Sequence, residues 1–168
     1  MTDLKFEKVS YEQFKKDLEK HKKSRNEDEI KYIYDNIKLP KRATKGSAGY
    51  DFILPYNLLL EKGIERIIPT GIRAKMPNNI VLKIYPRSGF GFKNGLQLLN
   101  TVGIIDSDYY YSDNEGHIFI KIRHTSGDYH LPIEQGQGIA QGIFSEYITT
   151  EDDSTEGIRN GGFGSTAK

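Results

Sequence analysis

The chain has 168 residues, of which 36% are hydrophobic and 28% charged, and its formal net charge at pH 7 is +1. This length and balance predict one globular domain, and so small a charge disfavours a protein that coats nucleic acid, so no stable nucleic-acid binding is expected. The chain contains no cysteine, which excludes disulfides, thiolate zinc sites and a cysteine nucleophile. No apolar run approaches the roughly 20 residues of a membrane span. The N-terminal segment has no stretch of signal-peptide type, so we expect a cytoplasmic protein without a membrane partner.

The N-terminal part of the chain predicts a short strand followed by two helices. Residues Leu4–Val9 contain apolar residues that alternate with charges, as in a half-buried strand. Ser10, with Gln13 three residues later, has the pattern of a capping box, so a helix should begin directly after Ser10. Apolar residues at helical spacing lie on both sides of the polar stretch Lys22–Glu29. We therefore expect a helical insertion at about residues 10–36, with its apolar face packed on the main body.

From residue 46 the pattern changes to short segments of period two. Apolar residues alternate with other residues at 80–85 and at 118–123, and Gly, Pro or Asn turns separate such segments about every ten residues. This pattern predicts an all-β sandwich or barrel, and residues 1–148 should form a single β-domain. Residues 149–168 have no buried pattern and are rich in Gly, Ser, Thr and acidic residues. We expect them to form a flexible C-terminal arm.

Four stretches are too rich in glycine or polar residues to be ordinary core: Ala43–Asp51, Pro86–Gly91, Asn100–Tyr109 and Gly161–Thr166. Each alone could be a turn or a solvated loop, but their chemistry is complementary. Arg87 offers a fork of donors suited to phosphate, and glycines leave backbone N–H groups open to an anion. Asp106 offers a base, while the rings of Tyr109 and Phe163 offer flat faces for a sugar or a base. Together they predict a site for a phosphate ester that carries a ring.

The order of these stretches resembles that of the five motifs of the trimeric all-β deoxyuridine triphosphatase (dUTPase) family. The third stretch, with Gly-Ile-Ile-Asp-Ser-Asp-Tyr, is the most specific, and Gly138–Gln141 is similar to the fourth family motif. The resemblance covers about residues 38–168. It implies a distorted β-barrel or jelly roll of short strands, a homotrimer, and the hydrolysis of dUTP to dUMP and pyrophosphate.

The resemblance also implies a role for each site residue. Asp106 matches the carboxylate that deprotonates the attacking water, and Tyr109 matches the ring that lies against the deoxyribose. The residues that match the hairpin that reads uracil are Asn100, Gly103 and Ile105. Contacts to phosphate are matched by Arg87, Ser88, Gly89, Gln141, Arg159, Ser165 and Thr166. Phe163 and Gly164 match the segment that closes over uracil, and Asp51 matches a residue that supports the region of metal and water. Mg²⁺ should be held mainly by the substrate's phosphates, and no direct protein ligand is assigned.

The sequence departs from the family's pattern at several places, among them the helical insertion and Ala167, which replaces a usual glycine. Gly138 stands where the fourth motif usually begins with a basic residue, and Ile158 stands where the fifth motif usually has an arginine, with Arg159 one position later. The segment Tyr110–Gly116, which follows the third motif, is about four residues longer than usual.

Two other functions compete with dUTP hydrolysis. A dCTP deaminase shares the fold, but that family has an Arg-Ser-Ser-rich second motif and a glutamate base, whereas this chain has Arg87-Ser88-Gly89 and Asp106. A nucleotide-binding interaction module without catalysis would have no need of Asp106 and Tyr109.

Overall fold

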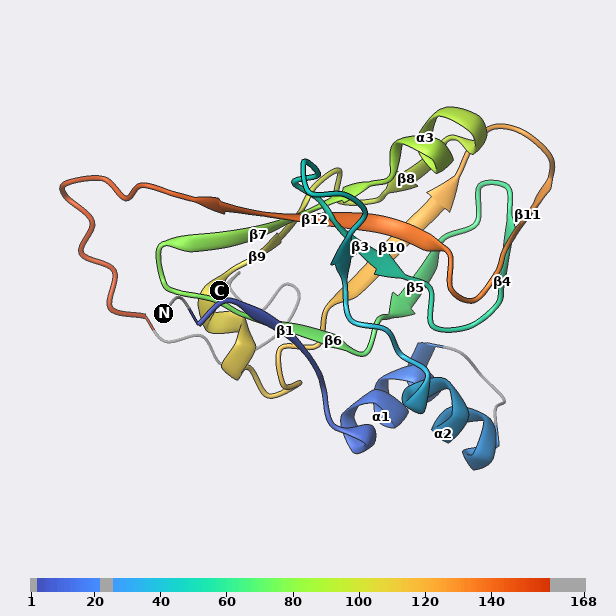
Figure 1. Ribbon diagram of the computed structural model, residues 1–168, viewed down its shortest axis with the longest axis horizontal. Helices are drawn as coiled ribbons and strands as arrows, with labels where there is room; N and C mark the ends of the chain where they lie inside the picture. Colours follow the sequence, from blue (N-terminus) through green and yellow to red (C-terminus); the bar gives the residue numbers. More distant parts are fainter. Residues whose placement is uncertain (1–2, 22–25, 158–168) are drawn as a thin grey trace.

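The computed structural model describes residues 3–21 and 26–157 (Figure 1). In chain order its elements are β1 (Lys5–Lys8), α1 (Tyr11–His21), α2 (Glu27–Asp35), β2 (Lys41–Arg42), β3 (Tyr50–Ile53), β4 (Leu58–Glu61), β5 (Arg66–Pro69), β6 (Ile72–Lys75), β7 (Ile80–Pro86), α3 (Ser88–Asn94), β8 (Leu96–Leu98), β9 (Gly103–Ile105), the 3₁₀ helix η1 (Ser107–Tyr111), β10 (Phe119–His124), β11 (His130–Ile133) and β12 (Gly138–Glu146). Short strands predominate in this order, which confirms the predicted all-β class.

A five-stranded antiparallel sheet forms the body of the molecule, in the order β2-β3-β12-β7-β9. Its long strands β12 and β7 run side by side through the centre (Figure 1). At Gly142 an added Cβ would come within 2.9 Å of both Leu82 Cδ1 and Phe52 Cε2, so glycine is needed there for the core to close over β12. Leu82 and Phe52 are among the most deeply buried side chains, which places the core against this sheet.

Smaller sheets complete the β-domain. A three-stranded sheet has the order β5-β10-β8, and the pairs β1-β6 and β11-β4 are two-stranded. The alternation predicted at residues 118–123 is present in β10, where Ile120 and Ile122 are buried and Lys121 is exposed. None of the helices in the described residues is long and apolar enough to cross a membrane.

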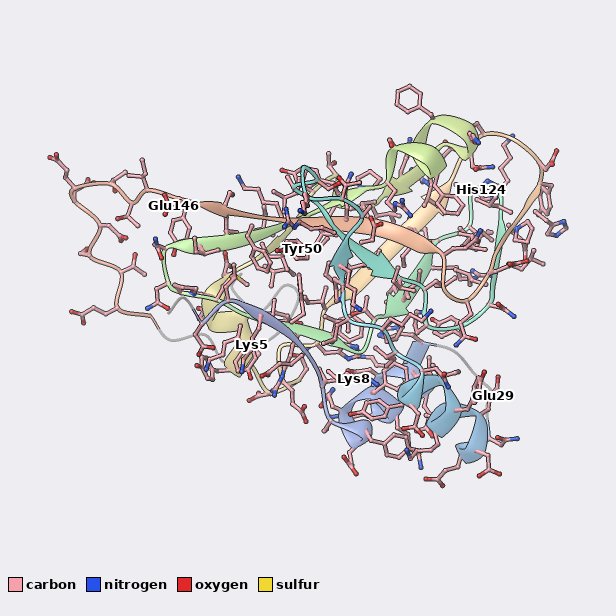
Figure 2. All side chains as sticks on the ribbon, viewed as in Figure 1. Lys5, Lys8, Glu29, Tyr50, His124 and Glu146 are labelled. Carbon is pink, nitrogen blue, oxygen red and sulfur yellow. The ribbon has the colours of Figure 1, made fainter. Side chains whose placement is uncertain are left out.

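The two predicted N-terminal helices are present as α1 and α2. Phe14, Leu18, Ile30 and Ile33 bury the facing sides of this helical hairpin, which confirms the predicted apolar face. Lys8, at the end of β1, fixes the end of α2 by donating from Nζ to the carbonyl oxygens of residues 34 and 35, at 2.8 and 3.2 Å (Figure 2). A cation at a helix C-terminus also complements the helix dipole.

The capping box predicted for α1 is half right. Ser10 Oγ accepts from the backbone N–H of Gln13 at 3.1 Å, as the pattern requires. Gln13 does not reach back to Ser10, because its Nε2 donates to Asp17 Oδ2 at 2.7 Å. The backbone N–H of Ser10 instead donates to the carboxylate of Glu115, at 2.7 Å, which is remote in the sequence. Tertiary structure thus supplies the half of the capping box that Gln13 was expected to supply.

The second helix begins inside the stretch that was predicted to be a polar joint. Asn26 caps it, since Asn26 Oδ1 accepts from the N–H of Glu29 at 2.8 Å. At the other end of the chain, residues 149–157 form no helix or strand. The rest of the predicted arm, residues 158–168, lies outside the described residues, so the division into domain and arm stays a prediction.

Candidate active site

Three of the predicted motifs meet in the five-stranded sheet. Asp51 on β3 is the register partner of Gln141 on β12, and Gln141 is in turn the partner of Tyr85 on β7. Arg87 follows directly after β7. Its Nε lies 3.2 Å from Asp51 Oδ1, and Gln141 Nε2 donates to the carbonyl oxygen of Pro86 at 3.3 Å. The sheet therefore gathers residues of the first, second and fourth motifs into one cluster, Asp51–Arg87–Gln141.

Two glycines make room for this cluster. At Gly49 an added Cβ would lie 2.4 Å from Gln141 Oε1, and at Gly138 it would lie 2.3 Å from Arg87 Nη1. The guanidinium of Arg87 thus fills the space that a side chain at position 138 would need. Arg87 therefore places a cation beside position 138, where the family's fourth motif usually has a basic residue.

The residues after Arg87 form the short helix α3, although their sequence alone is equally typical of a loop. Arg87 is the residue before α3, and Ser88 and Gly89 form the first turn, both exposed to solvent. No atom lies within 4 Å of the Cβ that Gly89 lacks, so the surface there is open.

The third motif forms strand β9 and the 3₁₀ helix η1. Asp106, half-buried, stands between these two elements, and Asp108 lies within η1 and is exposed. On a strand, two aspartates at positions i and i+2 would lie on the same face. Asp106 and Asp108 do not, because the strand ends before Asp106 and Asp108 lies within η1. Tyr109 is only 3% exposed, and its hydroxyl donates to the carbonyl oxygen of His117 at 2.7 Å.

The turn that leads into β9 contains the other predicted residues of this motif. Thr101 adopts φ +62°, and Asn100 beside it is exposed. An added Cβ on Gly103 would lie 3.1 Å from Ile84 Cβ, so a side chain at position 103 would crowd the contact between β9 and β7. Ile105 is buried, with 4% exposure.

Within one chain, Asp106 in the third motif lies far from the cluster Asp51–Arg87–Gln141, although the start of that motif lies nearer to it. Gly103 pairs with Ile84 and Ile105 with Leu82, so Asp106 continues past Leu82 toward the start of β7. Arg87 lies at the opposite end of the same strand. Along β7 the separation is about 20 Å, at ~3.3 Å per residue. Figure 1 shows the same arrangement, with α3 and the segment after β9 at opposite ends of β7.

The remaining predicted site residues cannot be located. Arg159, Phe163, Gly164, Ser165 and Thr166 lie outside the described residues. Among the residues that are described, no group of three or more His, Cys, Asp or Glu side chains could hold a metal ion.

Sequence reasoning missed the residues that hold Tyr109. Asn114 Nδ2 donates to the Tyr109 hydroxyl at 2.8 Å, and His117 accepts from it through its carbonyl oxygen. Both lie in or just beyond Tyr110–Gly116, which appeared in the sequence only as a longer loop. The pattern contains no signal for these contacts, because they depend on how the chain folds back over η1.

Comparison with known proteins gives a consistent result. The dUTPase family model matches residues 35–167. The deoxyuridine 5′-triphosphate nucleotidohydrolase of Lactococcus lactis is 42% identical over 139 residues, covering 81% of this chain and 92% of the relative. The crystal structure of dUTPase from Streptococcus mutans superposes with a TM-score of 0.65 at 31% identity, covering 87% of this chain and 98% of that one.

A more distant structure shares the fold. The dUTPase of phage phi11 of S. aureus, in a mutant form described with a structural Mg(II) ion, has a TM-score of 0.59 at 22% identity and covers 75% of this chain and 94% of that one. The extent of the family match and the identity to the Lactococcus lactis enzyme leave one conclusion: this chain belongs to the dUTPase family.

Proposed function

We propose that this chain hydrolyses dUTP to dUMP and pyrophosphate. The observation that carries the proposal is the family match over residues 35–167, which spans every one of the predicted motifs. In the reaction, a water oxygen bonds to the α-phosphorus. The bond from that phosphorus to the oxygen bridging to the β-phosphate breaks, and pyrophosphate leaves.

Asp106 is the general base of this proposal. Its carboxylate orients the attacking water and takes one of its protons as the new P–O bond forms. Its position suits this role, because the residue directly follows β9 and is only half-buried. Arg87 provides positive charge for phosphate oxygens, and Asp51 keeps its guanidinium in place through the 3.2 Å ion pair. Ser88, Gly89 and Gln141 add polar contacts to the phosphates.

Substrate selection falls to the third and fifth motifs. The ring of Tyr109 lies against the deoxyribose and leaves no room for a 2′-hydroxyl. Asn100 and the backbone from Gly103 to Ile105 hydrogen-bond uracil, so cytosine would leave buried polar groups unpaired and is rejected. Phe163 and Gly164 close over the base, and Arg159, Ser165 and Thr166 contact the terminal phosphates.

Magnesium fits this site as a partner of the substrate. The described residues offer no three-ligand cluster, and Mg²⁺ in proteins is often bound through substrate phosphates with few carboxylates. When bound, the ion neutralises charge on the phosphates and holds them compact. No residue of this chain is assigned as its direct ligand.

We further infer that the active enzyme is a homotrimer. Asp106 and the cluster Asp51–Arg87–Gln141 must act on the same α-phosphate, yet about 20 Å of β7 separates them within one chain. A neighbouring copy removes this difficulty if it contributes the second set of residues. The absence of membrane and nucleic-acid partners and the cytoplasmic location remain predictions from the sequence.

The test is to measure pyrophosphate release from dUTP, dCTP, dTTP and UTP, with and without Mg²⁺. The proposal expects dUTP to be the preferred substrate by a wide margin and Mg²⁺ to raise the rate. Release of ammonia from dCTP would instead support the deaminase alternative. Binding of dUTP with no turnover under any condition would support an interaction module.

A further inference from the structure

The Tyr109 side chain is held by the segment that follows it. Its hydroxyl donates to His117 O at 2.7 Å and accepts from Asn114 Nδ2 at 2.8 Å, so it both gives and receives a hydrogen bond within this segment. The carbonyl oxygen of Tyr109 also accepts from the N–H of Ser112 at 3.1 Å. The position of the ring therefore depends on the position of residues 112–117, which we call the bracing segment.

The bracing segment lies directly on the backbone of η1. At Gly116, which has φ +70°, an added Cβ would come within 2.8 Å of Tyr109 O and 2.7 Å of the Tyr110 Cα. The backbone of the bracing segment and that of η1 therefore pack together too closely to admit even a methyl group at position 116. A shift of the bracing segment must therefore move Tyr109 with it.

The first anchor of the bracing segment is Glu115. One carboxylate oxygen accepts from the backbone N–H of Ser10 at 2.7 Å, and the other accepts from Ser10 Oγ at 2.6 Å. Ser10 is the residue that caps helix α1. Glu115 has φ +58°, a backbone conformation that residues other than glycine seldom adopt. Glu115 thus has an unfavourable backbone angle at the same position where its side chain connects the segment after η1 to the start of α1.

The second anchor is His117, which is completely buried. The N–H of Gly71 donates to its Nε2 at 2.7 Å, so the proton of the neutral ring is on Nδ1. Nδ1 then donates to Asp17 Oδ2, also at 2.7 Å, and Asp17 lies on the buried side of α1. Both anchors therefore end on the same helix of the N-terminal hairpin.

We propose that Glu115 is a positioning residue for substrate selection. By tying the bracing segment to the start of α1, it fixes the Tyr109 ring at the place where the ring excludes a 2′-hydroxyl. The helical hairpin, which otherwise looks like an added piece on a β-domain, then serves the specificity of the enzyme. The inference rests on the proposed function, in particular on the role of Tyr109.

The bracing segment offers a matched set of variants. Asparagine tolerates a positive φ but is too short to reach Ser10, so Glu115→Asn removes the tether without adding backbone strain. Glu115→Gln keeps the length and one oxygen that can accept from the Ser10 N–H. Asp113→Asn, at an exposed position of the same segment, makes the same change of charge and introduces the same residue type.

The measurement is the ratio of kcat/KM for dUTP to kcat/KM for UTP, together with the midpoint of thermal unfolding. Glu115→Asn should lower this ratio about tenfold or more, since small displacements of a positioning group have effects of this order. Glu115→Gln should recover most of the ratio, and Asp113→Asn should retain it. An unchanged ratio in a folded Glu115→Asn enzyme overturns the inference, even if the thermal midpoint falls.

Two variants of Tyr109 complete the test. If Glu115→Asn does not fold, Tyr109→Phe breaks the same link at its other end while keeping the ring. It should lower the ratio as well, and an unchanged ratio would refute the inference. Tyr109→Leu removes the ring. If Tyr109→Leu leaves the ratio unchanged, the proposed role of Tyr109 is wrong. If it lowers the ratio while Glu115→Asn does not, only the inference about Glu115 fails.

Discussion

Arg87 and Asp51 form an ion pair with 3.2 Å between Nε and Oδ1, although Asp51 lies on β3 and Arg87 directly follows β7. The pair exists because β12 lies between β3 and β7 and presents Gly138 beside the guanidinium. Both side chains are partly exposed, so the pair adds little to the stability of the fold. The ion pair instead holds the Arg87 guanidinium in a defined position at the edge of the candidate site.

Gly138→Ala should displace that cation. The added Cβ would lie 2.3 Å from Arg87 Nη1, and the guanidinium can swing away because it is the end of a flexible side chain. We expect the KM for dUTP to rise about tenfold or more, the effect of losing a hydrogen bond to a charged group, while the thermal midpoint changes little. Gly91→Ala, whose Cβ would meet nothing closer than 3.9 Å, is the control. A KM equal to that of the wild type would show that Arg87 has no part in binding phosphate.

Asp106→Asn should abolish turnover while dUTP still binds. The carboxamide keeps the shape of the side chain but cannot accept a proton from the attacking water. General-base catalysis contributes roughly 10²–10⁴-fold, so the loss in kcat should be at least of that size. Single-turnover kinetics and calorimetric titration with dUTP would measure the two effects separately. The assignment cannot stand if the variant keeps a tenth of the wild-type rate.

Two variants that are each impaired at dUTP concentrations below their KM should recover activity when they are mixed. If each site takes Asp106 from one chain and Arg87 from another, trimers co-assembled from Asp106→Asn and Arg87→Ala chains contain some intact sites. Random assembly at equal amounts leaves about a quarter of the sites intact. Co-expression followed by an assay of dUTP hydrolysis would measure this fraction, and sedimentation would give the number of chains. A mixture as inactive as its components, or an active monomer, would contradict a shared site.

The contribution of Glu7 to stability should depend on pH. Hydrogen bonds from Tyr110 and then Lys5 lower the pKa of this carboxyl from 4.5 to about 2. A carboxyl whose pKa is lowered by folding stabilises the protein above its unfolded pKa, and this contribution is lost as the pH falls through the folded value. The difference in thermal midpoint between wild type and Glu7→Gln should therefore be full near pH 6 and shrink below about pH 4.5. Glu19→Gln, on the exposed face of α1, should show no such trend; a constant difference for Glu7→Gln would refute the prediction.

Deletion of residues 157–168 should cut turnover strongly and leave the fold intact. The last described strand ends at Glu146, so no described element is lost. Phe163, Ser165 and Thr166 would no longer contact the nucleotide, while circular dichroism and sedimentation should match the full chain. A truncated enzyme that works normally would exclude closure by the arm.

Within the arm, Arg159→Ala should weaken dUTP binding and leave dUMP binding nearly unchanged, because dUMP lacks the terminal phosphates. Equal effects on both ligands would show that Arg159 does not contact these phosphates.

Local patterns in the sequence were enough for the all-β class, the two N-terminal helices and the order of the motifs. These features depend on residues close together in the chain: the alternation in β10, the helical spacing around Phe14 and Leu18, and the Ser10 cap. The family resemblance came from short motifs, each of which is continuous. The period of apolar residues and the hydrogen bonds of a helix cap depend only on residues close together in the chain, so a sequence can be expected to reveal them.

The tertiary structure alone decided which distant residues meet. Arg87 fills the space beside Gly138, Glu115 binds the Ser10 cap of α1, and His117 joins Asp17 to Gly71. It also decided that Asp106 and Arg87 lie at opposite ends of β7, which is the basis of the proposal that the site is shared between chains. Such contacts arise from the register of strands and the path of loops. They have no period along the chain, because residues 51 or 105 positions apart become neighbours only after the core has closed.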